Sequence, residues 1–107
     1  MTRSLKAGIA FAAALAFGLP GGALAHTPVC ACYDNGDGSV LCEGGFSDGA
    51  TAAGVAMLVR DAGGATLIAG AIDANGEFEF EKPDGFADVL FDGGEGHQIV
   101  IPAAQIY

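Results

Sequence analysis

Two histidines are the residues of this chain whose surroundings best suit metal chemistry. The small-x-small pattern at Ala23–Ala25 is typical of a signal-peptidase site, and cleavage there makes His26 the first residue of the exported chain. An amino-terminal histidine can chelate one metal ion through its amine and its imidazole together. His97 follows the Gly-rich segment Gly94–Gly96, where an exposed imidazole can serve as a ligand. Both histidines are therefore candidate metal ligands, against the simpler interpretation that they are incidental.

Three cysteines offer a second set of candidate ligands. Cys30 and Cys32 are two residues apart, so on a strand they point to the same face, and a hairpin would bring Cys42 opposite them. A Cys32–Cys42 or a Cys30–Cys42 disulfide would cross-link this hairpin and leave one thiol. In the alternative, all three thiolates stay reduced and bind Cu(I) or Zn(II), with His26 completing the site.

Other polar groups do not form a recognisable catalytic site. Ser39 and Ser47 lie in no nucleophile motif, and no phosphate-binding loop is present. The loop Asp34–Gly38 lacks the spacing of an EF-hand and is interpreted as a hairpin turn. We expect the protein not to be an enzyme.

The chain begins with a segment that has the features of an export signal. Arg3 and Lys6 form a positive start, and the apolar run Ala7–Leu19 is shorter than the about 20 residues that span a bilayer. We interpret residues 1–25 as a signal peptide and residues 26–107 as one domain. The expected location is the periplasm or outside the cell, with no direct membrane insertion after cleavage.

Turn signals divide residues 26–107 into short segments. Fourteen of the eighteen glycines lie in these residues, and with the repeated Asp-Gly or Asn-Gly pairs they are typical of an all-β sandwich or barrel. Glu77–Glu81 alternates Glu with Phe, which places both phenylalanines on one face of a strand. We expect a small antiparallel sandwich, Ig-like or transthyretin-like, of about seven strands. The expected strands are 28–33, 39–43, 54–61, 65–72, 77–81, 86–92 and 97–102.

The charge of this domain limits its partners. All thirteen acidic residues lie in residues 26–107, against two basic ones, Arg60 and Lys82. Nucleic acid and anionic membranes would be repelled, whereas cations or a basic partner would be attracted. A surface that keeps the protein soluble is the simpler interpretation.

Three short motifs carry a resemblance to a known family. They are Gly-Phe-Ser-x-Gly at residues 45–49, Asp-x-x-Gly-x-Phe-x-Phe at residues 73–80 and Gly-x-Gly-His at residues 94–97. With these motifs the chain resembles the small periplasmic accessory subunit of bacterial nickel/cobalt uptake transporters of the energy-coupling-factor type. The central stretch is also similar to transthyretin-like, carboxypeptidase-regulatory-like β-sandwich modules.

The resemblance implies a function in metal handling. It implies that His26 and His97 bind nickel or cobalt and that a membrane transporter subunit is the partner. Cys30, Cys32 and Cys42 depart from the family pattern and would favour copper or zinc if they joined the site. We therefore expect a periplasmic transition-metal-binding accessory protein for metal uptake or homeostasis. The alternative is a structural or interaction module that binds no metal and is stabilised by a disulfide.

Overall fold

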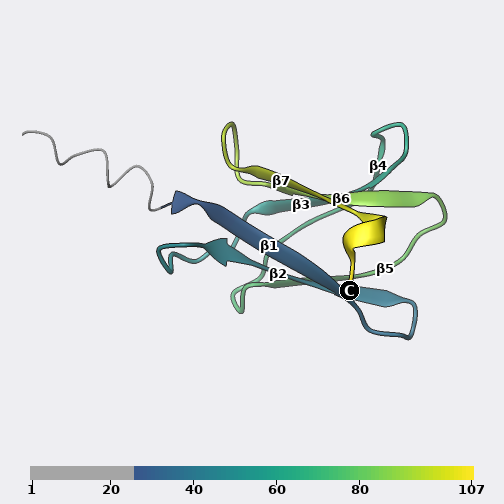
Figure 1. Cartoon of the computed structure of the whole chain (residues 1–107), viewed down its shortest axis with the longest axis horizontal. Coiled ribbons are helices and arrows are strands. Elements are labelled where there is room, and N and C mark those ends of the chain that lie inside the picture. Colours follow the sequence, from purple (N-terminus) through teal and green to yellow (C-terminus); the bar gives the residue numbers. More distant parts are fainter. Residues whose placement is uncertain (1–25) are drawn as a thin grey trace, which may run out of the picture.

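Two antiparallel sheets face each other in residues 26–107, the part of the chain that the computed structural model describes (Figure 1). The all-β sandwich of seven strands is confirmed, and the expected signal peptide, residues 1–25, lies outside the described residues. One sheet has the order β1-β2-β5, with β1 at Pro28–Asp34, β2 at Ser39–Phe46 and β5 at Glu77–Glu81. The other has the order β4-β3-β6-β7, with β4 at Thr66–Ala71, β3 at Ala56–Asp61, β6 at Phe86–Asp92 and β7 at Gln98–Pro102.

The expected and observed strands differ mainly at two places. β5 and β6 have the predicted bounds, whereas β2 continues to Phe46, where Phe46 lies opposite Pro28 of β1. A short 3-10 helix, η3 at Ala103–Gln105, follows β7 and was not expected. It turns the chain so that Tyr107 exchanges main-chain hydrogen bonds with Cys32 and Asp34 of β1. The end of the described chain is thereby tied to the edge of the three-stranded sheet.

The core lies between the two sheets because alternate residues of each strand point inward. Phe91 of β6 is the largest of the fully buried side chains. The other buried residues of this core that lie in strands are Cys32, Val40, Cys42, Met57, Val59, Phe80, Val89 and Ile101. β4 and β7 are the edge strands of the four-stranded sheet, and β4 is mostly exposed.

Aspartates build many of the turns. Six of them accept a hydrogen bond from the main-chain N–H two residues further along the chain. They are Asp34, Asp37, Asp48, Asp61, Asp73 and Asp92. Hydrogen bonds to the charged carboxylate lower the pKa of Asp37, from the Ser39 side chain first, and the pKa of Asp92, from Gln98 first. Much of the acidic composition therefore has a local structural role.

Two adjacent glycines in β2 face opposite sides of the sheet and provide a matched test of the packing. A methyl group at Gly44 would lie 2.9 Å from Cε2 of Phe91, whereas one at Gly45 would meet nothing closer than 4.0 Å. We expect Gly44→Ala to lower the free energy of unfolding by about 1–3 kcal/mol through overpacking. Gly45→Ala is expected to raise it by up to about 1 kcal/mol, because glycine weakens a strand. Urea unfolding of both variants checks this, and equal effects would contradict the packing described.

Candidate functional site

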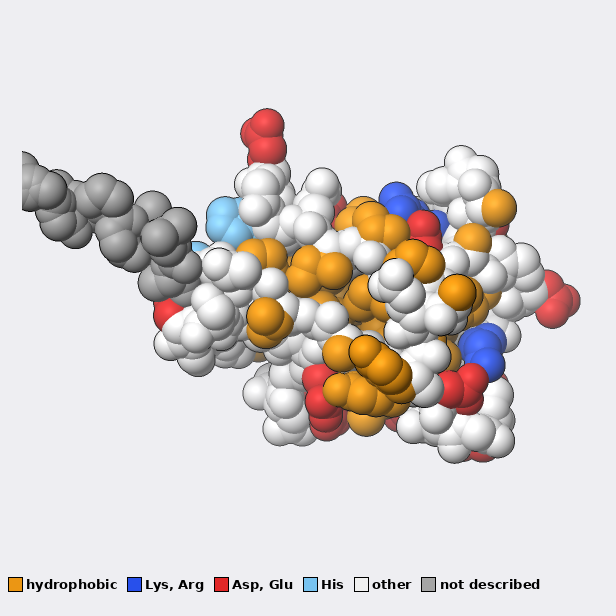
Figure 2. All heavy atoms as spheres, in the orientation of Figure 1, with side chains coloured by type: hydrophobic (Ala, Val, Ile, Leu, Met, Phe, Trp, Pro, Cys, Tyr) orange, Lys and Arg blue, Asp and Glu red, His pale blue; other side chains and the backbone are white. Residues whose placement is uncertain are grey.

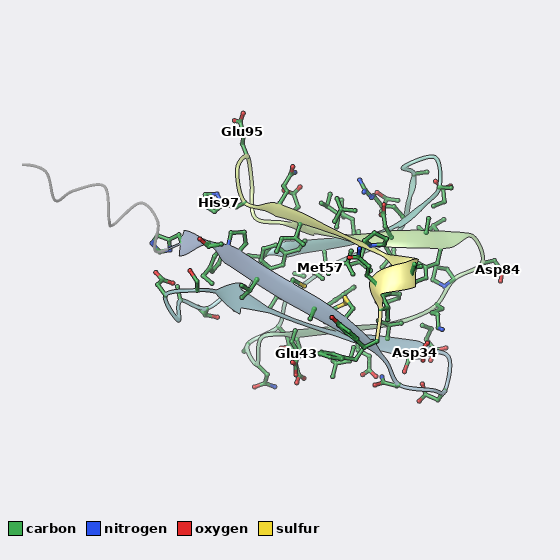
Figure 3. All side chains as sticks on the ribbon, viewed as in Figure 1. Asp34, Glu43, Met57, Asp84, Glu95 and His97 are labelled. Carbon is green, nitrogen blue, oxygen red and sulfur yellow. A yellow bond between two sulfur atoms is a disulfide. The ribbon has the colours of Figure 1, made fainter. Side chains whose placement is uncertain are left out.

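His26 and His97 lie at the same end of the sandwich, where both rings contact the ring of Phe46. The ring of Phe46 is 6.2 Å from the ring of His26 and 6.4 Å from the ring of His97, measured between centroids, and both contacts are edge-on. Figure 3 shows His97 near the beginning of β1, on the turn that has Glu95 at its tip. The fold thus brings together two histidines that are 71 positions apart in the numbering.

Strand β6 and the turn before β7 position Phe46 and His97 at this end of the sandwich. Phe46 is the last residue of β2 and packs edge-on against Phe91, with 6.2 Å between ring centroids. The turn before β7 is closed by a hydrogen bond from the N–H of His97 to the carbonyl of Gly94, at 2.9 Å. Nδ1 of His97 lies 3.3 Å from the carbonyl of Glu95. When Nδ1 donates to that carbonyl, Nε2 is the nitrogen with the free lone pair.

Asp48 is a candidate site residue that sequence reasoning missed. Its Oδ2 lies 3.1 Å from Nδ1 of His26, while its Oδ1 accepts a hydrogen bond from the N–H of Ala50 at 2.9 Å. The second contact fixes the carboxylate in the turn after β2, and the first aims it at His26. In the sequence, Asp48 differs in no way from the other turn aspartates, so only the folded arrangement identifies it.

The disulfide joins Cys32 to Cys42, which confirms one of the two predicted pairings. The two residues are directly opposite in the β1–β2 register, and both are fully buried. Their Cα atoms are 4.0 Å apart, as in a close, non-hydrogen-bonded pair of an antiparallel ladder. While this bond is intact, neither sulfur is a thiolate. The three-thiolate alternative would require its reduction.

Cys30 is the free thiol among the described cysteines. It shares the inward face of β1 with Cys32, and it is half-buried against the core. Burial raises the pKa of the Cys30 thiol to about 11, because removal from water disfavours the charged thiolate. At neutral pH the thiol is therefore protonated and is a poor metal ligand.

Side-chain donors alone do not complete a metal site. Within residues 26–107 no group of three or more His, Cys, Asp and Glu side chains is arranged to hold a metal ion. The three cysteines lie in the β1–β2 hairpin and pack in or against the core. The two histidines contact Phe46, and His26 also contacts Asp48. An α-amine at His26 would be an additional donor beside Nδ1 and Asp48, and such an amine exists only after cleavage.

Comparison with known proteins adds no family assignment. No family model matches the chain, and neither a curated protein nor a solved structure matches it. The fold and site define a small two-sheet β-sandwich with one disulfide, and the resemblance to nickel/cobalt transporter subunits stays a prediction. Among residues 26–107, no helix is both long enough and apolar enough to cross a membrane.

Proposed function

We propose that this is a periplasmic accessory protein that binds one transition-metal ion at its His26 end, for metal uptake or homeostasis. The observation that supports this best is the 3.1 Å approach of Nδ1 of His26 to the carboxylate of Asp48, together with the contact of both the His26 and the His97 ring with Phe46. A membrane transporter subunit is the proposed recipient of the ion. In this proposal the protein binds and passes on the metal and catalyses no reaction.

The proposed chemistry begins with the exported amino terminus. The amine and Nδ1 of His26 close a six-membered ring around a metal ion, and Nδ1 is also the atom that faces Asp48. Asp48 then supplies a carboxylate oxygen as the third donor. His97 is assigned as a further ligand, brought in by movement of its glycine-rich turn. Two or three nitrogens with one oxygen suit Ni(II), Co(II), Cu(II) or Zn(II) better than soft Cu(I).

The cysteines have a structural role in this proposal. Cys32 and Cys42 are joined to each other, and the Cys30 thiol is protonated at neutral pH because burial raises its pKa to about 11. The metal therefore remains nickel or cobalt, or else copper or zinc bound through nitrogen and oxygen. Cu(I) binding that survives His26→Ala and depends on Cys30 would contradict this assignment.

Metal titration of the secreted, processed protein tests the proposal. Intact mass first establishes that the chain begins at His26, and calorimetry then follows Ni(II), Co(II), Cu(II), Zn(II) and Cu(I). We expect one equivalent of a divalent ion to bind with a sub-micromolar Kd. His26→Ala should weaken binding by more than about 100-fold, because it removes a direct ligand, and Asp48→Asn by about 10-fold.

Three controls make the metal titration decisive. Asp84→Asn removes a carboxylate from the exposed turn between β5 and β6, far from His97 in Figure 3, and should leave the affinity unchanged. His97→Ala should weaken binding less than His26→Ala. Acetylation of the amino terminus should weaken binding as strongly as His26→Ala, because it removes the amine. A processed chain that begins elsewhere, or that binds none of the five ions, would overturn the proposal.

The second candidate function is a structural or interaction module that binds no metal. The observation that favours it is that Cys32 and Cys42, two of the predicted metal ligands, are bonded to each other and fully buried, so they stabilise the hairpin and are not available to a metal. The same titrations separate the two candidates, because this module should bind none of the ions.

A further inference from the structure

The outer side of the three-stranded sheet combines acidic and apolar side chains. Strand alternation turns Phe80, Cys32 and Cys42 inward, and it turns their neighbours on the same strands outward. We call this side the outer face; its members in the argument below are Val29, Tyr33, Glu43, Gly45, Glu77 and Glu79. Figure 2 shows acidic side chains beside a hydrophobic patch in this lower part of the molecule, and Figure 3 places Glu43 there.

The carboxylates of the outer face lack cationic partners. Glu43 lies directly opposite Glu77 in the β2–β5 register, and like charges in such a pair destabilise a sheet. The two basic side chains of residues 26–107 are used elsewhere. Arg60 contacts Asp88 at 2.8 Å, and Lys82 contacts Asp34 at 2.6 Å. The described part of the chain therefore contains no Lys or Arg that neutralises Glu43 and Glu77.

Apolar surface and a hollow lie next to these carboxylates. Val29 is 49% exposed and Tyr33 is 40% exposed. The ring of Tyr107 stacks on that of Tyr33 with 5.8 Å between centroids, which extends the apolar surface. A shallow hollow of about 440 Å³ lies where Gly45, opposite Val29, has no side chain, and Glu43 contributes to its wall. This arrangement matches a long side chain that has an apolar stem and a charged end.

We propose that the outer face docks a basic polypeptide segment of a partner protein. A Lys or Arg of the partner would lay its aliphatic stem along Val29 and Gly45 and place its charge between Glu43 and Glu77. Charge complementarity selects this occupant. A second copy of the chain would present the same acidic face, and nucleic acid or an anionic membrane would be repelled. The proposal does not depend on metal binding at His26.

A peptide probe tests the proposal on the processed protein in the presence of EDTA. The probe is a fluorescein-labelled peptide of alternating Arg and Val, with a peptide of alternating Glu and Val as the sequence control. We expect anisotropy to report micromolar binding of the Arg peptide, which weakens as salt is added, and no binding of the Glu peptide. The double variant Glu43→Gln/Glu77→Gln should weaken binding about 5- to 10-fold.

A matched double variant separates a specific face from general attraction to an acidic protein. Asp84→Asn/Glu95→Gln removes two charges from turns away from the outer face, as Figure 3 shows, and should leave the affinity within about twofold. Glu43→Gln/Glu77→Gln should keep or raise the melting temperature, because a like-charge pair is removed, so loss of binding cannot reflect unfolding. Equal losses in both double variants would overturn the proposal.

Two further measurements distinguish other occupants. Sedimentation that shows self-association dependent on Glu43 and Glu77, or binding to vesicles of phosphatidylserine and phosphatidylcholine that depends on them, would overturn the proposal. His26→Ala should leave peptide binding unchanged. If the unsubstituted processed protein binds the peptide but none of the five ions, the proposed function alone is overturned. If it binds an ion but not the peptide, the docking face alone is overturned.

Discussion

Replacing both Cys32 and Cys42 with alanine is expected to lower the free energy of unfolding by about 3 kcal/mol. The two cysteines are ten positions apart, and a cross-link that closes so short a loop removes about this much chain entropy from the unfolded state. The bonded pair is also fully buried, so its loss removes core packing as well. A domain of this size has only a few kcal/mol of net stability, so we expect much of the variant to be unfolded at 37 °C. Urea unfolding followed by circular dichroism measures the change.

Cys30→Ala is the matched control for this prediction. Cys30 lies on the same strand and face as Cys32 but forms no disulfide. Its half-buried side chain is only one sulfur atom larger than that of alanine. We expect its effect to be below about 1 kcal/mol. Unfolding the unmodified protein in a thiol reductant should reproduce the loss seen for the double variant. A double variant as stable as the oxidised protein would show that the hairpin register holds without the cross-link.

Phe91→Ala is expected to lower the free energy of unfolding by about 3–5 kcal/mol, the range for a fully buried phenylalanine. Its ring fills the space left by Gly44, so truncation opens a cavity that the rigid β2 backbone cannot readily close. Phe46 packs against Phe91 and contacts the rings of both histidines, so the His26 end should loosen as well. We expect weaker metal binding although Phe91 is not itself a proposed ligand.

The control for Phe91→Ala is Val100→Ala, because Val100 lies in the neighbouring strand β7 and is half exposed. We expect a change below about 0.5 kcal/mol, without effect on metal affinity. Chemical unfolding and metal titration are measured on both variants under conditions where each is folded. Phe91→Ala with full stability would contradict the packing, and full metal affinity would contradict the support of the site through Phe46.

Local sequence signals were sufficient for strands with strong alternation and clear turns. Glu77–Glu81 repeats every second residue between an Asn-Gly turn and a proline, and the observed strand has the same bounds. The end of β2 could not be found this way, because Gly44 and Gly45 resemble a break in the strand. Gly44 is required there by Phe91, which is 47 positions further along the chain, and no local pattern contains that information.

In the candidate site too, residue spacing predicts some features, whereas others depend on contacts between segments that are far apart in the sequence. Spacing limited the disulfide to two pairings, and the register of the folded hairpin selects Cys32–Cys42. The His26–Asp48 contact depends on how the turn after β2 folds back on the start of β1, so no motif predicts it. The acidic composition was interpreted as a solvated or partner-binding surface. Several of the aspartates on this surface also hold turns, and Glu43 and Glu77 have no basic side chain beside them among residues 26–107.

The open edge of β4 determines how the protein should be handled at high concentration. Its residues, Thr66–Ala71, include no charge and no proline, and β3 is its one neighbour in the sheet. Such an edge can template strand addition between molecules, which leads to aggregation. At neutral pH the strongly negative charge of the chain keeps molecules apart, but that repulsion disappears near the isoelectric point, which the composition of all 107 residues places at about 4.2. Purification and storage should therefore avoid buffers close to this pH.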